Sequence, residues 1–269
     1  REDIKKEAEP FVLEKTELSG TTVLRHCLFT NGIGYLTLLF DTRQVPYDLI
    51  PYLGILKSVL GYVSTEHFGY GDLFNEINMH TGGIYTSVAT YANAKEPEKY
   101  RLMYEVRAKV MYDKLPFAMK MTEEILCTSD FDDDKRLYEI LAMLKSRLQM
   151  SMTSAGHSTA ALRAMSYCSE TAQLSDMLGG LSFYRLVEKL ESHFEQEKHG
   201  LIQQLKRVMK YIFRPENLLV DYTAEEKGFA QLEEVLAAFK KTLHTEAVAK
   251  EPYTIETIRK NEGLKTSGK

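Results

Sequence analysis

The histidines and their neighbours are the residues most able to hold a metal or to move protons. The chain has seven histidines, and zinc peptidases pair two of them on one helix as His-Glu-x-x-His or as His-x-x-Glu-His. Neither pattern occurs. Glu66-His67 supplies half of the inverted pattern, but Val63 stands at the first ligand position and has no lone pair to donate. His193 and His199 lie about 240° apart around a helix. These histidines are therefore expected to have ordinary surface roles.

The string from Ser154 to Ser158 has the composition of a hydrolytic site, because it places His157 between hydroxyl groups. It lacks the Gly-x-Ser-x-Gly turn that presents a catalytic serine. Side chains this close along a helix start diverge, so they do not form a nucleophile and base pair. We expect helix-capping hydroxyls and a structural histidine. Asp132-Asp133-Asp134 has no calcium-loop spacing after it, and the glycines near Gly32 do not complete a dinucleotide fingerprint.

Composition narrows the class of protein further. The chain has 269 residues, of which 44% are hydrophobic and 27% are charged, and these values exclude disorder. No run approaches the roughly 18 to 20 apolar residues of a membrane span. A net charge of -4 disfavours nucleic-acid binding. Cys27, Cys127 and Cys168 are far apart and odd in number. They indicate buried free thiols in a reducing compartment rather than disulfides or a thiolate zinc site.

Hydrophobic periodicity predicts the elements that would position these residues. Residues 22–29 and 34–40 are β-rich and flank Thr30-Asn31-Gly32, which predicts a hairpin. Helical spacing follows at 47–62 and 71–79, and further strands are predicted at 84–91 and 102–110. The next part is helical at 115–127, 132–152, 159–178 and 183–213, with Asp132 as a helix cap. A strand at 217–222 precedes a last helix at 224–243, capped by Thr223.

The order of these elements predicts the architecture. Strands, then helices, then a strand and a helix indicate an α+β fold rather than a doubly wound parallel sheet. We expect one mostly antiparallel sheet with helices packed mainly on one face. The chain begins with Arg1 rather than Met, so we expect a piece of a longer protein. The predicted divisions are a lead-in at 1–13, a domain at 14–244 and a linker at 245–269.

Several short strings, taken in order, resemble a known family. The resemblance is to presequence protease and its bacterial relatives in the pitrilysin/insulinase superfamily of zinc metallopeptidases, and it runs from about residue 14 to 239. It matches the third of four homologous domains, which opens the C-terminal half of those enzymes. The strings are Leu28-Phe29-Thr30-Asn31-Gly32-Ile33, Leu39-Phe40-Asp41, Leu49-Ile50-Pro51-Tyr52-Leu53, His80-Thr81-Gly82-Gly83-Ile84, Gly156-His157 and Leu178-Gly179-Gly180-Leu181-Ser182.

The resemblance implies a clamshell peptidase in which only the first domain holds zinc. The corresponding positions here are Ile55, Ser58 and Val59, which cannot supply the His, Glu and His of the inverted motif. The chain would then be noncatalytic and, alone, inactive and without a metal or other cofactor. It would contribute chamber wall and interdomain contacts, and the chamber-lining or structural positions would be His157, Ser154, Ser158, Gly82 and Gly83.

The implied partners are the catalytic half and the following domain of the same polypeptide, with a peptide as the parent's substrate and with neither nucleic acid nor membrane. The implied location is the bacterial cytoplasm or, in a eukaryote, an organelle matrix. A second hypothesis is a freestanding interaction or assembly module that uses a degenerate peptidase fold.

Overall fold

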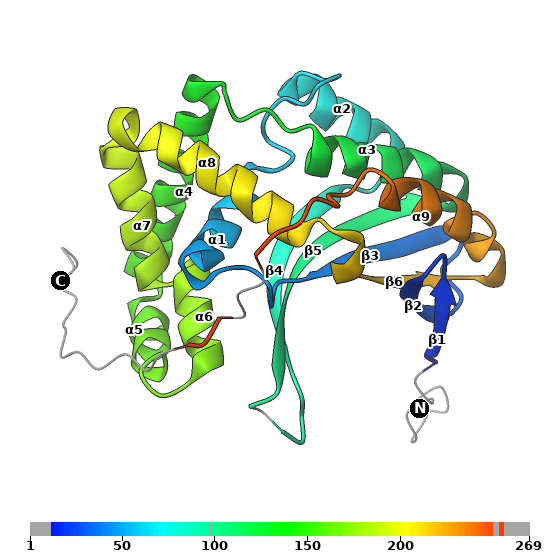
Figure 1. Cartoon of the computed structure of the whole chain (residues 1–269), viewed down its shortest axis with the longest axis horizontal. Helices are drawn as coiled ribbons and strands as arrows, with labels where there is room; N and C mark the ends of the chain where they lie inside the picture. The colour runs from blue at the N-terminus through cyan, green and yellow to red at the C-terminus, as the bar shows by residue number, and fades with distance from the viewer. Residues whose placement is uncertain (1–11, 97, 250–252, 256–269) are drawn as a thin grey trace, which may run out of the picture.

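A six-stranded sheet organises the fold (Figure 1). The computed structural model describes residues 12–96, 98–249 and 253–255. The strand order is β1-β2-β6-β3-β5-β4, and every pair is antiparallel except β2 with β6. The strands are β1 (Glu14–Leu18), β2 (Thr21–Cys27), β3 (Ile33–Asp41), β4 (Ile84–Ala92), β5 (Tyr100–Met111) and β6 (Leu218–Ala224).

The predicted hairpin between the second and third strands is wrong. The turn itself forms, because Asn31 and Gly32 both have positive φ, at 52° and 82°, as a type I′ turn requires. The two strands nevertheless diverge, and β6 lies between them. Leu219 of β6 pairs with Thr22 on one side and with Leu39 on the other. The sequence analysis also missed β1, a short and mainly polar edge strand.

The helical regions match the hydrophobic period, with differences at their ends. Asp133, not Asp132, caps α4, since its side chain accepts a hydrogen bond from the Arg136 amide at 3.0 Å. The helices are α1 (Ile50–Val59), α2 (Tyr70–His80), α3 (Leu115–Cys127), α4 (Asp134–Ser154), α5 (Gly156–Met165), α6 (Glu170–Gly179), α7 (Leu181–Ser192), α8 (Phe194–Ile212) and α9 (Leu232–Lys240). Short 3-10 helices lie at Tyr47–Leu49, Tyr112–Lys114, Pro215–Asn217 and Glu226–Phe229.

Three predicted helices are shorter than expected. The stretch 159–178 divides into α5 and α6, because the Ser166 hydroxyl donates to the Arg163 carbonyl and Ser169 then caps α6. The stretch 183–213 divides at His193 into α7 and α8. The stretch 224–243 yields only α9. Thr223 is not its cap, because Thr223 pairs with His26 and Tyr35 inside the sheet.

The helices cover one face of the sheet, as expected. In Figure 1, α3, α8 and α9 lie on one side of the strands. The strand residues beneath them are buried and apolar, among them Leu38, Val106 and Val220. The Phe213 ring meets the Phe40 and Tyr104 rings at centroid distances of 5.2 and 5.4 Å. This face and the helices form one continuous core, the feature that lets a domain fold alone. The predicted α+β class is confirmed.

The expected burial of the cysteines is wrong for two of the three. Cys27, at the end of β2, and Cys168, between α5 and α6, are exposed, and Cys127 is half-buried. All three are free thiols. The two exposed thiols lie where an element ends, so the core does not enclose them. Across the residues that the structure describes, no helix is both long and apolar enough to cross a membrane.

Candidate functional site

The helix that resembles the zinc helix of the family cannot bind zinc here. In α1 the Ile55 and Val59 side chains are fully buried. The Ser58 hydroxyl donates to the Gly54 carbonyl at 3.2 Å and thus belongs to the helix itself. These residues do not fit a zinc ion. Within residues 12–96, 98–249 and 253–255, no group of three or more His, Cys, Asp or Glu side chains is placed to hold a metal.

The histidines singled out in the sequence lie apart from one another. His67 is mostly exposed, and its Nδ1 lies 2.6 Å from the buried Glu124 carboxylate of α3. Burial alone would raise the pKa of Glu124, but hydrogen bonds from Thr128 and His67 hold it below its usual value. This contact ties the loop before α2 to α3. His193 and His199 are exposed, in the region of the α7–α8 junction.

The Ser154 to Ser158 string forms the junction of α4 and α5. Ser154, His157 and Ser158 are exposed there. The Ser154 hydroxyl donates to the Ser151 carbonyl, and the Ser158 amide donates to the Ala155 carbonyl. Both contacts are local and support the helix ends. The junction packs among helices α4, α5 and α6, so these side chains do not reach the sheet.

Gly82 and Gly83 join α2 to β4 and hold the start of that strand. Gly83 has φ 106°, a conformation that favours glycine. The Gly82 amide donates to the Lys109 carbonyl at 2.7 Å, and the Gly83 amide donates to the Thr81 hydroxyl at 3.0 Å. A side chain at Gly82 would contact the Lys109 side chain. The geometry at both glycines fixes the β4 edge against β5.

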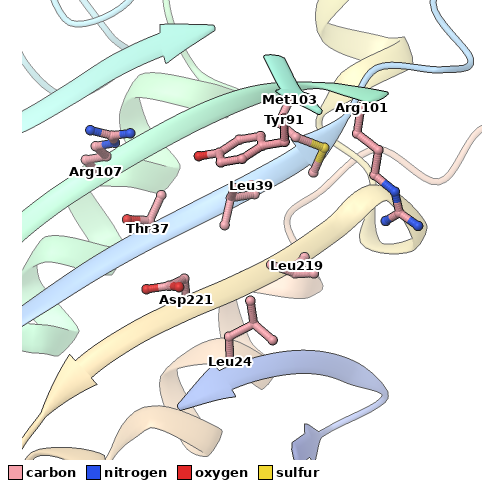
Figure 2. A pocket seen from close by; sticks show the side chains of 9 residues that line it. All are labelled: Leu24, Thr37, Leu39, Tyr91, Arg101, Met103, Arg107, Leu219 and Asp221. Carbon is pink, nitrogen blue, oxygen red and sulfur yellow. The ribbon is translucent and has the colours of Figure 1, made fainter. Parts of the chain in front are cut away.

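The other face of the sheet carries the most developed concave surface. We call it the helix-free face, and its central residues alternate with the core residues along each strand. A hollow of about 310 Å³ lies on this face (Figure 2). Its residues come from five neighbouring strands, so the sheet register alone brings them together. They are Leu24, Thr37, Leu39, Tyr91, Arg101, Met103, Arg107, Leu219 and Asp221.

A buried carboxylate lies at one wall of the hollow. The Glu105 side chain has no exposed surface although it belongs to the helix-free face. The Ser87 hydroxyl donates to it at 2.8 Å, the Tyr91 hydroxyl also donates, and Arg107 forms an ion pair at 2.7 Å. Burial and the hydrogen bond to Glu105 raise the pKa of Tyr91 to about 12. Tyr91 is therefore a neutral donor at physiological pH.

A second polar contact lies on the opposite side of the hollow. The His26 Nε2 is 3.2 Å from the Asp221 carboxylate, and its Nδ1 is 2.7 Å from the Val12 carbonyl. In Figure 2, Asp221 and Thr37 point into the same space from adjacent strands, with Arg101 at the far end. Sequence analysis missed these residues. The available signal was the alternation of polar and apolar residues along β5 and β6.

This arrangement suits contact with a chain rather than bond cleavage. Leu24, Leu39, Met103 and Leu219 give the hollow an apolar floor, and charged and hydroxyl groups stand around it. Its nine lining residues include no His, Cys or Ser. A floor of this kind, with a few polar groups around it, can take an apolar side chain of an extended peptide and orient its backbone.

Comparisons with known proteins agree with the fold. HypA of Clostridium perfringens is 34% identical over 267 residues, which are 99% of this chain and 27% of that protein. Presequence protease 1, chloroplastic/mitochondrial, of Arabidopsis thaliana is 26% identical over 239 residues, 88% of this chain and 22% of that protein. The chain thus spans about a quarter of the length of these relatives.

A solved structure shows the same fold at low identity. The peptidase M16 inactive domain from Pseudomonas fluorescens superposes with a TM-score of 0.59 at 14% identity, over 92% of this chain and 53% of that chain. The predicted resemblance to presequence proteases is confirmed. The family of domains associated with the peptidases of group M16, subgroup C, matches residues 1–190, and the chain belongs to this family.

Proposed function

We propose that this chain is a noncatalytic domain of a peptide-degrading zinc metalloendopeptidase. It would be part of a longer polypeptide, the parent polypeptide, whose other half binds zinc. The observation that carries the proposal is the helix-free face, with its hollow, in a chain whose α1 offers no zinc ligand. The domain would span residues 14–244, with 245–269 leading to a following domain.

The helix-free face would form a wall of the chamber. A closed chamber holds a peptide near the metal and excludes bulk water, which can contribute to rate as much as an additional ligand. The apolar floor and the polar groups around it suit an extended peptide, and the domain's other surfaces would contact the catalytic half and the following domain. We infer a location in a bacterial cytoplasm or an organelle matrix, where proteins with the names of the relatives would meet free peptides.

Three proteins test the proposal: this chain, the zinc-binding half and the parent polypeptide. We expect stoichiometric zinc in the zinc-binding half and the parent, and peptide cleavage only in the parent. Metal analysis and cleavage of a fluorogenic peptide measure these two properties. One equivalent of zinc in this chain with chelator-sensitive cleavage would contradict the proposal. Full activity of the zinc-binding half alone would favour a freestanding interaction module.

A pair of variants in the parent polypeptide tests the role of the face itself. Thr37→Trp places a large ring in the hollow, whereas Ser146→Trp places the same ring on the exposed surface of α4. We expect at least a tenfold loss of peptide turnover for Thr37→Trp, with zinc content unchanged. Turnover should stay within twofold for Ser146→Trp. Equal activity of the two variants would mean that the helix-free face does not contact the substrate.

His157→Ala provides the corresponding test of the Ser154 to Ser158 string. Because His157 is exposed at the α4–α5 junction, we expect peptide turnover of the parent to stay within about tenfold of wild type. Removing a general base costs about 10²-fold or more. A loss of that size, with zinc content and thermal unfolding unchanged, would show that His157 takes part in the reaction.

A further inference from the structure

The loop that joins β2 to β3 displays an aromatic side chain to solvent. We call residues 28–33 the Phe29 loop. The Phe29 side chain is 85% exposed, and its neighbour Leu28 is 46% exposed. Met111, which is opposite Ile33 in the sheet register, is 62% exposed. These apolar groups form a projecting cluster at the end of the strands, and water would cover it in the isolated chain.

The turn within this loop is held in one conformation by the backbone. The Ile33 amide donates to the Thr30 carbonyl at 3.2 Å, which closes the type I′ turn through Asn31 and Gly32. The Leu28 amide donates to the Ala224 carbonyl at 3.1 Å, so the residue before Phe29 still belongs to the β2–β6 ladder. Phe29 is therefore flanked on both sides by hydrogen-bonded backbone.

Two side chains outside the loop fix it further. The Tyr112 hydroxyl shares a hydrogen bond with the Thr30 hydroxyl at 2.7 Å and accepts one from the Glu225 amide at 2.9 Å. The Glu225 carboxylate accepts from the Thr30 and Gly32 amides, each at 3.4 Å. Holding an exposed ring in one position reduces the entropy that a docking contact would cost.

The charges around the cluster already have partners within the chain. Arg25 pairs with Glu226 at 2.6 Å, and Lys227 pairs with Glu225 at 3.2 Å. A partner surface would therefore meet an uncharged projection with its neighbouring charges neutralised. Such a projection fits an apolar pocket, since charged residues opposite it would be desolvated without compensation.

We infer that the Phe29 loop is an anchor that docks into an apolar pocket on another domain of the parent polypeptide. This inference rests on the proposed function. The matched relatives are about four times as long as this chain, so the parent offers such a domain on the same polypeptide. A tethered domain acts at an effective concentration of about 1 mM, well above that of a free second copy. We therefore assign the anchor to a domain of the same polypeptide.

The exposed cysteines provide a test without any added label site. Cys27 ends β2 beside the loop, and Cys168 lies between α5 and α6; each is exposed, and each donates one weak hydrogen bond. Maleimide labelling, followed by mass spectrometry of each peptide, gives the rate at each thiol. From this chain alone to the parent, we expect Cys27 to become at least tenfold slower, and Cys168 to change less than Cys27.

Phe29→Ala in the parent separates the anchor from a general shielding of the surface. We expect this variant to return Cys27 labelling to within about threefold of the rate in this chain alone. Met150→Ala, an exposed methionine of α4, should leave the protection in place. Equal Cys27 rates in the two proteins, or protection that persists in Phe29→Ala, would overturn the inference. Protection that depends on the concentration of this chain alone would assign the loop to a second copy and also overturn it.

Peptide cleavage, measured on the same samples, distinguishes this inference from the proposed function. An unprotected Cys27 in a parent polypeptide that cleaves peptide and needs this domain would remove the anchor and leave the proposed function in place. Full activity of the zinc-binding half alone would remove the proposed function, whatever the labelling rates.

Discussion

Asp176→Ala is expected to lower the free energy of unfolding by about 3 to 5 kcal/mol. Asp176 lies near the end of α6 and is 1% exposed. Its carboxylate accepts from Arg163 Nη1 at 2.6 Å, from the Leu181 amide at 2.8 Å and from the Ser182 hydroxyl at 2.5 Å. The substitution would take the carboxylate away from a guanidinium that is itself largely buried, and it would remove the cap of α7.

Asp134→Ala is the matched control for this prediction. Asp134 begins α4 and also forms an ion pair, with Lys198 at 2.5 Å, but its side chain is nearly half exposed. Exposed pairs contribute about 0 to 1 kcal/mol, so this variant should lose no more than about 1 kcal/mol. Urea unfolding followed by circular dichroism measures both variants. Losses of equal size would show that the Asp176 cluster does not hold the α6–α7 corner.

The same corner shows what a sequence string can and cannot predict. Gly179-Gly180 correctly predicts a break between two helices. The structural reason is that a side chain at Gly180 would lie 2.5 Å from the Asp176 carboxylate oxygen and 2.8 Å from the Asp176 Cα. Nothing in the sequence distinguishes Asp176 from a solvated acid on a helix. Its partners come from three different segments, and only the packing of α5, α6 and α7 joins them.

Strand order is a second property that local patterns could not supply. The β-rich runs near 22–29 and 34–40, with an Asn-Gly turn between them, have every local feature of a hairpin. Val220 of β6 takes the place between Val23 and Leu38, although it is nearly two hundred residues away along the chain. Periodicity reports which residues are buried. It does not report which buried strand pairs with which, because that depends on long-range contacts.

The hollow on the helix-free face could not be predicted for a related reason. Residues that suggested chemistry, such as His157, lie in the helical layer. Glu105 stands in an alternating strand pattern where an acid indicates a solvated face. It is buried because Tyr91 of the edge strand and Arg107 of its own strand cover it. Alternation therefore identified the outward face correctly, but no local pattern indicates that the polar residues of this face enclose a carboxylate.

Gly54→Ala should destabilise the fold, although alanine is the better helix former. A Cβ at Gly54 in α1 would lie 2.7 Å from the Phe183 ring and 3.0 Å from the Leu178 backbone carbonyl. That carbonyl also accepts a hydrogen bond from Lys57, one turn further along α1. Overpacking of this kind costs about 1 to 3 kcal/mol. Since helix propensity returns about 1 kcal/mol, we expect a net loss of about 1 to 2 kcal/mol.

Gly200→Ala makes this prediction one of sign rather than size. Gly200 lies inside α8, with nothing within 4 Å of the position its Cβ would take. The same chemical change should therefore stabilise the protein there, by about 1 kcal/mol. Urea unfolding of the two variants should move the midpoint in opposite directions. If both variants gain stability, α1 can move away from Phe183, and the close approach of α1 to the α6–α7 corner does not depend on glycine. If Gly54→Ala alone loses stability, glycine is required at that contact because no side chain fits between the helices.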